Sequence, residues 1–598
     1  MSAVRVGNAS GFYGDRFSAM RDMLEDGELD YLTGDYLAEL TMLILGRDRM
    51  KDSSTGYAKT FIRQMQDCMG LAKEKGVRIV TNAGGLNPAG CAAKLREIAA
   101  EQGLDISIAH VEGDDLIARA EEFNFTDVAG GNVVTANAYL GAFGIAAALS
   151  AGADIVVTGR VTDASVIVGP AIAHFGWGRE DFDKLASAVV AGHIIECGTQ
   201  ASGGNFSGFT SIDLGRPGFP IAVIEDDGSL VITKHSGTSG AVTVDTVTAQ
   251  LVYEITGEAY LGPDVTTHLD TMTLTQEGPD RVAITGVTGS APPSTAKVCL
   301  NAIGGFRNSV EFILTGLDIE EKAALVREQM GTALKASPPD VIEWQLDRTD
   351  VPDPETQAAA TTLLRCHVKS SSPEPVGRAF TGAAIELALG SYPGFAVTRP
   401  PAAGTPYGIY RAAYVRQDQV PHTVVFADGT RVEIAPPNPA SGADLSASGT
   451  RAALVPRATS ASSPRPGSRA SPAFWSPSAP LGGMGATPFG RLVFARSGDK
   501  GGDANVGLWI PAEHPRRDEA YAWLEQLLDK KTVTQLLPET VGLDIDIHPL
   551  ANLKAVNIVI HGLLGDGVAA STRFDPQAKA LGEWIRARFV AIPAELIA

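Results

Sequence analysis

The sequence predicts an α/β fold: a mostly parallel sheet with helices on both faces, an antiparallel hairpin region, and a small α+β domain at the C-terminal end. Over the first 200 residues, short apolar runs alternate with helix-period segments, which is typical of a parallel sheet covered by helices. Shorter alternating runs between glycine turns follow, and these indicate hairpins. The chain has 598 residues, more than one core ordinarily holds, so two or three domains are expected.

A large domain is predicted over residues 1–435, and its first part, 1–205, is expected to be the βα core. Five apolar runs are expected to be strands: 4–7, 29–32, 77–81, 106–111 and 155–158. Two amphipathic helices are expected between them, at 57–75 and 89–100.

The second part of the large domain, 206–435, is predicted to be mixed α+β. Alternating apolar and polar residues indicate hairpin strands in three runs: 220–235, 240–255 and 281–290. Asp227-Gly228 is a strong hairpin signal. The remainder is expected to contain a helix at 319–336, a strand and a helix within 355–388, and strands at 408–415 and 423–434.

Residues 436–487 are rich in Pro, Ser and Ala and show no periodicity, which predicts a flexible linker. The last domain is predicted over 488–598, with its helices on one face of an antiparallel sheet. Its expected strands are 491–498, 505–511 and 553–564, and its expected helices are 518–527 and 577–590.

The formal net charge of −20 disfavours nucleic acid and anionic membranes as partners. Five widely spaced cysteines without a CxxC motif indicate neither a zinc site nor a disulfide framework, and they fit a reducing compartment. The N-terminal segment lacks a signal-peptide pattern, and the apolar stretches are too short to cross a membrane. We therefore expect a cytoplasmic protein with a small-molecule substrate.

Polar, glycine-bearing loops follow all five predicted strands. Because the carboxyl ends of parallel strands meet at one edge of a sheet, these loops are expected to converge on one rim and form a ligand site. Turn and helix-cap formation is the alternative, since Asn, Asp and Gly are common in both. The candidate ligand-binding residues in these loops are Asn8, Ser10, Gly11, Asp35, Asn82, Gly84, Gly85, Asp114 and Arg160.

The loop that contains Gly7, Gly11 and Gly14 follows the first strand and only loosely matches a dinucleotide fingerprint. A phosphate-bearing ligand held by backbone N–H groups at the start of the next helix is the more general expectation.

A second dense polar region spans 192–206. On a helix, His193, Glu196 and Cys197 share one face, so they are candidates for an acid/base pair or a thiol nucleophile. An ordinary helix C-terminus with a buried cysteine is the alternative. Gly203, Gly204 and Asn205 follow as candidate ligand-binding residues.

No metal site is predicted, because the sequence has no H-E-x-x-H motif and no regular spacing of His and Asp. An oxygen-rich magnesium site made by Glu112, Asp114, Asp163 and Glu196 stays an open alternative.

The stretch RSGDKGGDANVG near the C-terminal end has more glycine than a simple hairpin turn needs. We interpret it as an ordered loop that docks onto the large domain or a neighbouring subunit. Docking would place Asp499 or Lys500 at the rim of the main site. A charged hairpin turn is the alternative.

The motifs GNASGFYGDR, TGDYLAELTM, TNAGGLNP, ADIVVTGRVTDASV and GHIIECGTQASGGNFSG resemble the acyclic terpene utilisation family AtuA. RSGDKGGDANVGLW and GLLGDGVAASTRFDPQAKALGE resemble the ferredoxin-fold domain associated with that family. The resemblance implies a role in bacterial catabolism of citronellol, geraniol and related branched acids through acyl-CoA intermediates. It favours a hydratase or a carbon–carbon lyase.

Such a reaction needs a base, an acid and donors to an oxyanion. The hypothesis assigns Glu196 or Asp163 as base, His193 as acid, and Arg160 as holder of a carboxylate or phosphate. The expected oxyanion donors are the backbone N–H groups of Gly84 and Gly85 or of Gly203 and Gly204.

No cofactor is expected apart from the CoA of the substrate. A homo-oligomer is expected, because a ferredoxin-like sheet has edges to protect. Two alternatives stay open: a non-catalytic protein that binds acyl-CoA or organises a complex, and a nucleotide-dependent enzyme that uses the loop between Gly7 and Gly14.

Overall fold

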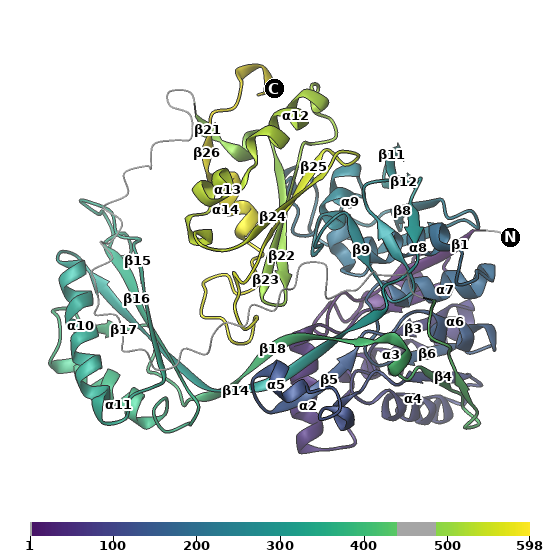
Figure 1. The fold of residues 1–598 in the computed structure, drawn as a ribbon, viewed down its shortest axis with the longest axis horizontal. Coiled ribbons are helices and arrows are strands. Elements are labelled where there is room, and N and C mark those ends of the chain that lie inside the picture. The colour runs from purple at the N-terminus through teal and green to yellow at the C-terminus, as the bar shows by residue number, and fades with distance from the viewer. Residues whose placement is uncertain (1–2, 439–485, 598) are drawn as a thin grey trace.

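The computed structural model describes residues 3–438 and 486–597 (Figure 1). It confirms the predicted class, a large α/β body followed by a small α+β domain. The predicted linker, 436–487, lies for most of its length outside the described residues.

Five parallel strands form the centre of an 11-stranded sheet in the order β1-β2-β3-β6-β4. All five were predicted: β1 (Val4–Asn8), β2 (Tyr31–Gly34), β3 (Arg78–Thr81), β4 (Ile108–Glu112) and β6 (Ile155–Thr158). Strand β5 (Val133–Ala138) was not predicted. It is not part of this sheet and pairs with a strand of a second sheet.

Antiparallel hairpins extend both edges of the parallel strands, so the complete sheet is mixed. Next to β1 lie β7 (Pro220–Ile224), β8 (Leu230–Lys234), β12 (Arg281–Thr285) and β11 (Thr273–Gly278). The predicted strand at 423–434 is a hairpin next to β4, made of β19 (Thr423–Val425) and β20 (Arg431–Glu433).

Helices cover both faces of the sheet, and the side-chain alternation of the strands explains why. Ile155 and Val157 point into one core while Val156 points into the other. The first core is covered by α1 (Ala19–Glu25), α3 (Lys59–Lys75) and α4 (Pro88–Gln102). The second is covered by α6 (Phe143–Ser150), α7 (Ser165–Phe175) and α8 (Phe182–Ile195).

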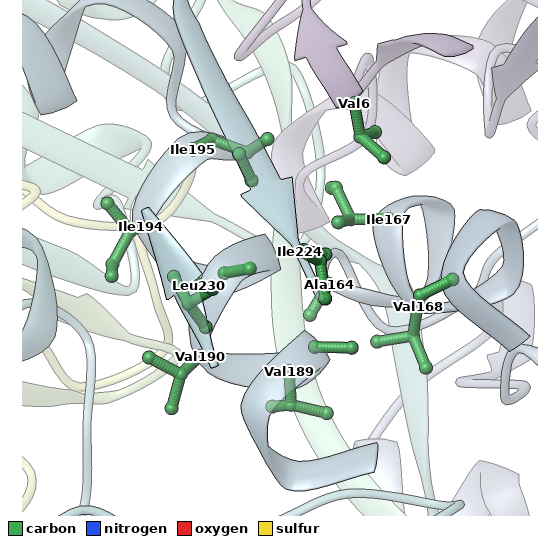
Figure 2. Close-up of a cluster of buried hydrophobic side chains, with 14 of the residues drawn as sticks. Val6, Ala164, Ile167, Val168, Val189, Val190, Ile194, Ile195, Ile224 and Leu230 are labelled. Carbon is green, nitrogen blue, oxygen red and sulfur yellow. The ribbon is translucent and has the colours of Figure 1, made fainter. Parts of the chain in front are cut away.

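The end of α8 is fixed by the second core. Figure 2 shows Ile194 and Ile195 in one buried cluster with Val6 of β1, Ile167 of α7 and Ile224 of β7. All five side chains are fully buried. Glu196, the candidate catalytic residue that follows α8, is therefore attached to a backbone that this packing holds in place.

The prediction of a strand at 240–255 is wrong, because this segment contains the helix α9 (Val244–Leu251). Thr243 and Thr246 form a reciprocal capping box at its start, at 3.1 Å and 2.9 Å. The residues that follow the cap are rich in Val and Thr, which favour strands, but burial of the helix against the second core outweighs that preference.

A second sheet is built around β14 (Thr295–Thr315), a strand of 21 residues. Its first half pairs with β5, and β18 (Thr405–Arg416) runs beside most of its length. Its second half enters a separate lobe with its own core (Figure 1). That lobe contains α10 (Ile319–Ala333), β15 (Val341–Asp347), β16 (Thr361–Ser370), α11 (Arg378–Glu386) and β17 (Ala396–Val397).

The C-terminal domain is a four-stranded antiparallel sheet in the order β22-β23-β25-β24 with three helices. Its strands are β22 (Phe494–Lys500), β23 (Asp503–Trp509), β24 (Ile545–Leu550) and β25 (Ala555–Ile560). Its helices are α12 (Arg517–Leu527), α13 (Lys530–Leu536) and α14 (Leu581–Ala587). The predicted helix at 577–590 is thus shorter, because Phe589 and Val590 pair with Thr487 and Pro488 instead.

The C-terminal domain docks onto the large body through a contact surface that we call the domain seam, formed by Phe206, Val252, Glu254, Asn505 and Trp509. Trp509 is fully buried and stacks on Phe206, with ring centroids 6.3 Å apart. Asn505 donates to the carbonyl of Val252 and accepts from the N–H of Glu254, both at 2.8 Å. These contacts confirm the predicted docking of RSGDKGGDANVG onto the large domain. The prediction of a loop is wrong, because the stretch is the end of β22 and the start of β23, joined by a turn at Gly501 and Gly502.

Replacing Asn505 with Ala is expected to destabilise the domain seam. The change leaves the Val252 carbonyl and the Glu254 N–H buried without a partner, which costs about 1–3 kcal/mol for each group. Urea unfolding monitored by tryptophan fluorescence measures the loss. Asn438→Ala, at an exposed site, is the control, and equal unfolding midpoints for the two variants would contradict the prediction.

His561 is expected to make the stability of the C-terminal domain depend on pH. Its ring lies between Asp503, at 3.2 Å, and Asp546, at 2.9 Å, and the hydrogen bond to Asp503 contributes most to raising its pKa to about 9. Because the folded pKa lies above the ordinary value of 6.5, the stabilisation is complete below pH 6.5 and disappears as the pH rises through 9.

Denaturant midpoints between pH 6 and pH 10 test this dependence. The wild type should lose more stability over that range than His561→Gln. His514→Gln in the same domain is the control, because the His514 ring bonds to the backbone of Leu596 and Arg516. Parallel pH profiles for the wild type and His561→Gln would refute the assignment.

Candidate functional site

Three predicted site residues meet beyond the carboxyl ends of the parallel strands. Asp35 follows β2, Asp163 follows β6 and Glu196 caps α8. One carboxylate oxygen of each lies within 4.8 Å of the others, and we call these three residues the acidic triad. Asp35 and Glu196 are only 5% and 6% exposed, whereas the side chain of Asp163 is 26% exposed. The loops that the sequence placed on one rim therefore do converge here.

Hydrogen bonds to neighbouring loops orient Asp35. Its Oδ1 accepts from the side-chain amide of Asn82 at 2.6 Å and from the N–H of Leu37 at 3.0 Å. The Asn82 amide oxygen in turn accepts from the N–H of Tyr36 at 2.8 Å. Asn82 thus ties the loop after β3 to the loop after β2 and holds Asp35 in place.

Arg160 is the cation paired with the triad. Its guanidinium lies 2.9 Å from Asp163, donates to the carbonyl of Leu37 at 2.8 Å, and stacks on the ring of Tyr139 at 4.3 Å. Arg160 is almost fully buried. Its side chain serves first to fix Asp163, which reduces the donors it has left for a substrate carboxylate or phosphate.

Asn8 and Gly11 position Glu196 from the opposite side. The Asn8 amide donates to the carbonyls of Ile195 and Glu196 at 2.7 and 2.8 Å. A Cβ at Gly11 would lie only 2.7 Å from the backbone of Cys197, so only glycine fits there. The hydroxyl of Ser10 donates to the carbonyl of Phe12 and shapes the same loop. These three residues therefore support the site through internal contacts, whereas the prediction had them contact a ligand.

The loop between Gly7 and Gly14 does not form the expected phosphate cradle. The carboxylate of Asp15 already accepts from the N–H groups of Gly11 and Arg16, at 2.8 and 2.7 Å. The protein's own anion therefore occupies the position that a phosphate would take. This finding argues against the nucleotide-dependent alternative.

His193 and Cys197 both flank the Glu196 carboxyl. The His193 Nδ1 lies 3.8 Å from Oε1 of Glu196, and the Cys197 thiol lies 4.0 Å from the same oxygen. Burial, with the nearby charge of Lys500, lowers the pKa of His193 to about 3. Burial and the Glu196 carboxyl raise the pKa of Cys197 well above its usual value.

These directions correct two predicted roles. At neutral pH His193 is a neutral imidazole rather than an acid, and Cys197 is a thiol rather than a thiolate nucleophile. Burial and the charges of Asp163 and Asp35 also raise the pKa of Glu196, so this carboxyl does not act as an ordinary exposed base.

The C-terminal domain brings two predicted residues, Lys500 and Asp499, to the same region. Burial alone would lower the pKa of Lys500, but the Tyr260 phenol and the carboxylates of Glu254 and Glu39 hold it above its usual value. Burial and the charge of Glu254 raise the pKa of Asp499 to about 8. Lys500 thus supplies a half-buried positive charge near these carboxylates.

Sequence reasoning missed four residues near Lys500, namely Glu39, Glu254, Tyr260 and Lys297. Lys297 lies 3.5 Å from Glu39, which also accepts a 3.1 Å hydrogen bond from Tyr139. The side chains of Lys297 and Glu39 are 22% and 27% exposed, so solvent reaches the cluster from this side. Lys297 alone carried a signal, because it is the one charged residue in the apolar run TAKVCLNAI.

Several predicted ligand residues form the scaffold of the site. The N–H groups of Gly85, Gly203 and Gly204 donate to carbonyls of their own turns at 2.9–3.2 Å, so these three do not provide the expected oxyanion donors. A Cβ at Gly84 would lie 2.4 Å from the Thr158 carbonyl, which explains glycine at that position. The carbonyl of Asn205 accepts from Arg496 across the domain seam at 2.8 Å.

The alternative magnesium site combined Glu112 and Asp114 with Asp163 and Glu196. The fold gives the first two residues other partners and brings only the last two together. Glu112 pairs with Arg431, and Asp114 accepts hydrogen bonds from Arg160 N–H and Asn137, both at 2.8 Å. Asp163 and Glu196 do lie together, with Asp35 as the third carboxylate.

Comparison with known proteins assigns the chain. Within the described residues, no helix has the length and apolar character needed to span a membrane. Comparisons with curated proteins and with solved structures found no match. The model of the acyclic terpene utilisation family protein AtuA matches residues 4–426, and the model of the AtuA ferredoxin-like domain matches residues 487–591. The chain therefore belongs to the acyclic terpene utilisation family AtuA.

Proposed function

We propose that this protein is an enzyme in the catabolism of branched acyclic acids, acting as a hydratase or a carbon–carbon lyase on an acyl-CoA or a related carboxylic acid. Membership of a family implicated in acyclic terpene utilisation supports the pathway. The observation that carries the reaction class is the half-buried cluster in which the charge of Lys500, from the C-terminal domain, acts on the carboxyl groups of Glu254 and Glu39 in the large body.

Hydration of an α,β-unsaturated thioester needs two functions that this cluster contains. A carboxylate takes a proton from water as the water oxygen bonds to the β-carbon, and the electron pair of the double bond moves onto the thioester oxygen as an enolate. The α-carbon then takes a proton to complete the hydration. A nearby cation lowers the energy of the enolate most in a dry, low-dielectric site.

Retro-aldol cleavage uses the same groups. A carboxylate removes the proton of a β-hydroxyl, the bond between the α- and β-carbons breaks, and its electrons form the same enolate. Lys500 is the residue that we assign to the enolate oxygen. It is half-buried and positively charged, and it forms no ion pair within 4.0 Å among the described residues.

Lys500→Ala is expected to lower kcat/KM by roughly 100-fold or more, because removing one donor to a developing oxyanion has about that effect. Lys500→Arg should retain part of the activity, since the charge is kept. The assay follows purified protein with branched enoyl-CoA and 3-hydroxyacyl-CoA thioesters, by loss of enoyl absorbance and by chromatography of the products.

Lys554→Ala is the matched control, because Lys554 lies in the same domain and pairs with exposed Asp518. Full activity of Lys500→Ala would rule out the assigned role. Thermal stabilisation of the wild type by CoA thioesters without any turnover would instead support an acyl-CoA-binding protein.

A further inference from the structure

The acidic triad has the geometry of a cation site. Its three oxygens come from loops on three different elements, and all lie within 4.8 Å of one another. Some point therefore lies within about 2.8 Å of all three oxygens, a few tenths of an ångström beyond the 2.3–2.6 Å of calcium and about 0.7 Å beyond the 2.0–2.1 Å of magnesium. An inward movement of the side chains brings the three oxygens to bonding distance, and water supplies the remaining ligands of the shell.

A second observation points to a ligand at this place. Oε2 of Glu196 is buried and has no hydrogen-bond partner among the described residues, although Glu196 is 94% shielded from solvent. Buried polar groups are rarely left unsatisfied in a folded protein without a functional reason.

The charge balance of the triad gives the same indication. Three carboxylates stand together, and among the described residues only Arg160 pairs with one of them as a permanent cation. Gathering like charges in a buried place is costly unless a proton or a counter-charge joins them. A divalent ion offsets this repulsion and uses the unpartnered oxygen of Glu196.

We propose that Asp35, Asp163 and Glu196 bind one divalent cation with a preference for oxygen ligands, of the magnesium or manganese class. The hydrogen bond from Asn82 to Asp35 and the ion pair between Arg160 and Asp163 act as the outer contacts that orient such ligands. An ion held here polarises a carbonyl oxygen brought next to it. The proposal rests on the geometry of the triad and does not depend on the reaction proposed above.

Binding of Mn²⁺ to the full chain tests the site. The protein is stripped with chelator and titrated with MnCl₂, while the electron paramagnetic resonance signal of free Mn²⁺ is recorded. We expect one Mn²⁺ per chain, displaced by excess Mg²⁺. Glu196→Gln and Asp35→Asn are each expected to weaken binding at least tenfold, and circular dichroism confirms that the variants are folded.

Asp115→Asn is the matched control. Asp115 lies in the loop after β4 and pairs with Arg49 outside the triad, so this variant should bind Mn²⁺ like the wild type. Absence of Mn²⁺ binding to the wild type at millimolar concentration would overturn the proposal. Binding that persists unchanged in both triad variants would also overturn it. Because the readout is binding, it separates the cation site from the proposed reaction.

Discussion

The candidate site depends on one constraint, the shared core at the domain seam. Trp509 of the C-terminal domain is buried in the same apolar cluster as α7 and α8, so the two domains cannot slide past each other without exposing it. Asn505 then fixes the register through the backbone on both sides of Tyr253. Lys500 lies at the end of β22, which pairs with β23. The docking of β23 at the domain seam therefore fixes the position of the Lys500 charge relative to the large body.

The large body supplies the other half of the site by a different principle. Its parallel strands end at one rim. Short polar contacts between the loops at this rim restrict the mobility that such loops usually have. The neighbouring backbone and carboxylates take up the polar side chains of Asn8, Asn82 and Arg160, through hydrogen bonds and one ion pair. The outcome is a site whose acidic groups are held by the protein even though their charges repel.

Local patterns in the sequence were enough to find the parallel strands and to place Asp35 and Asp163 on one rim, because the topology of a parallel sheet dictates where strand ends meet. Glu196 was predicted only as part of a polar group at a helix end, and its meeting with the two aspartates follows from the packing of α8. The helix α9 was missed because the spacing of its Val and Thr residues fits both a strand and a helix. Burial against the second core favours the helix. Glu39 and Lys297 were missed for another reason. Their proximity depends on the long pairing of β14 with β5, which no local pattern encodes.

The order of these elements along the chain has a consequence for synthesis on the ribosome. The residues of the acidic triad all lie within the first 200 residues, but β14, which carries Lys297, pairs with β5 through residues 298–302 and so only after these have emerged. Lys500 follows later still. Since domains fold as units from the N-terminal end during translation, the large body with its acidic triad is expected to form before the C-terminal domain brings Lys500 to it.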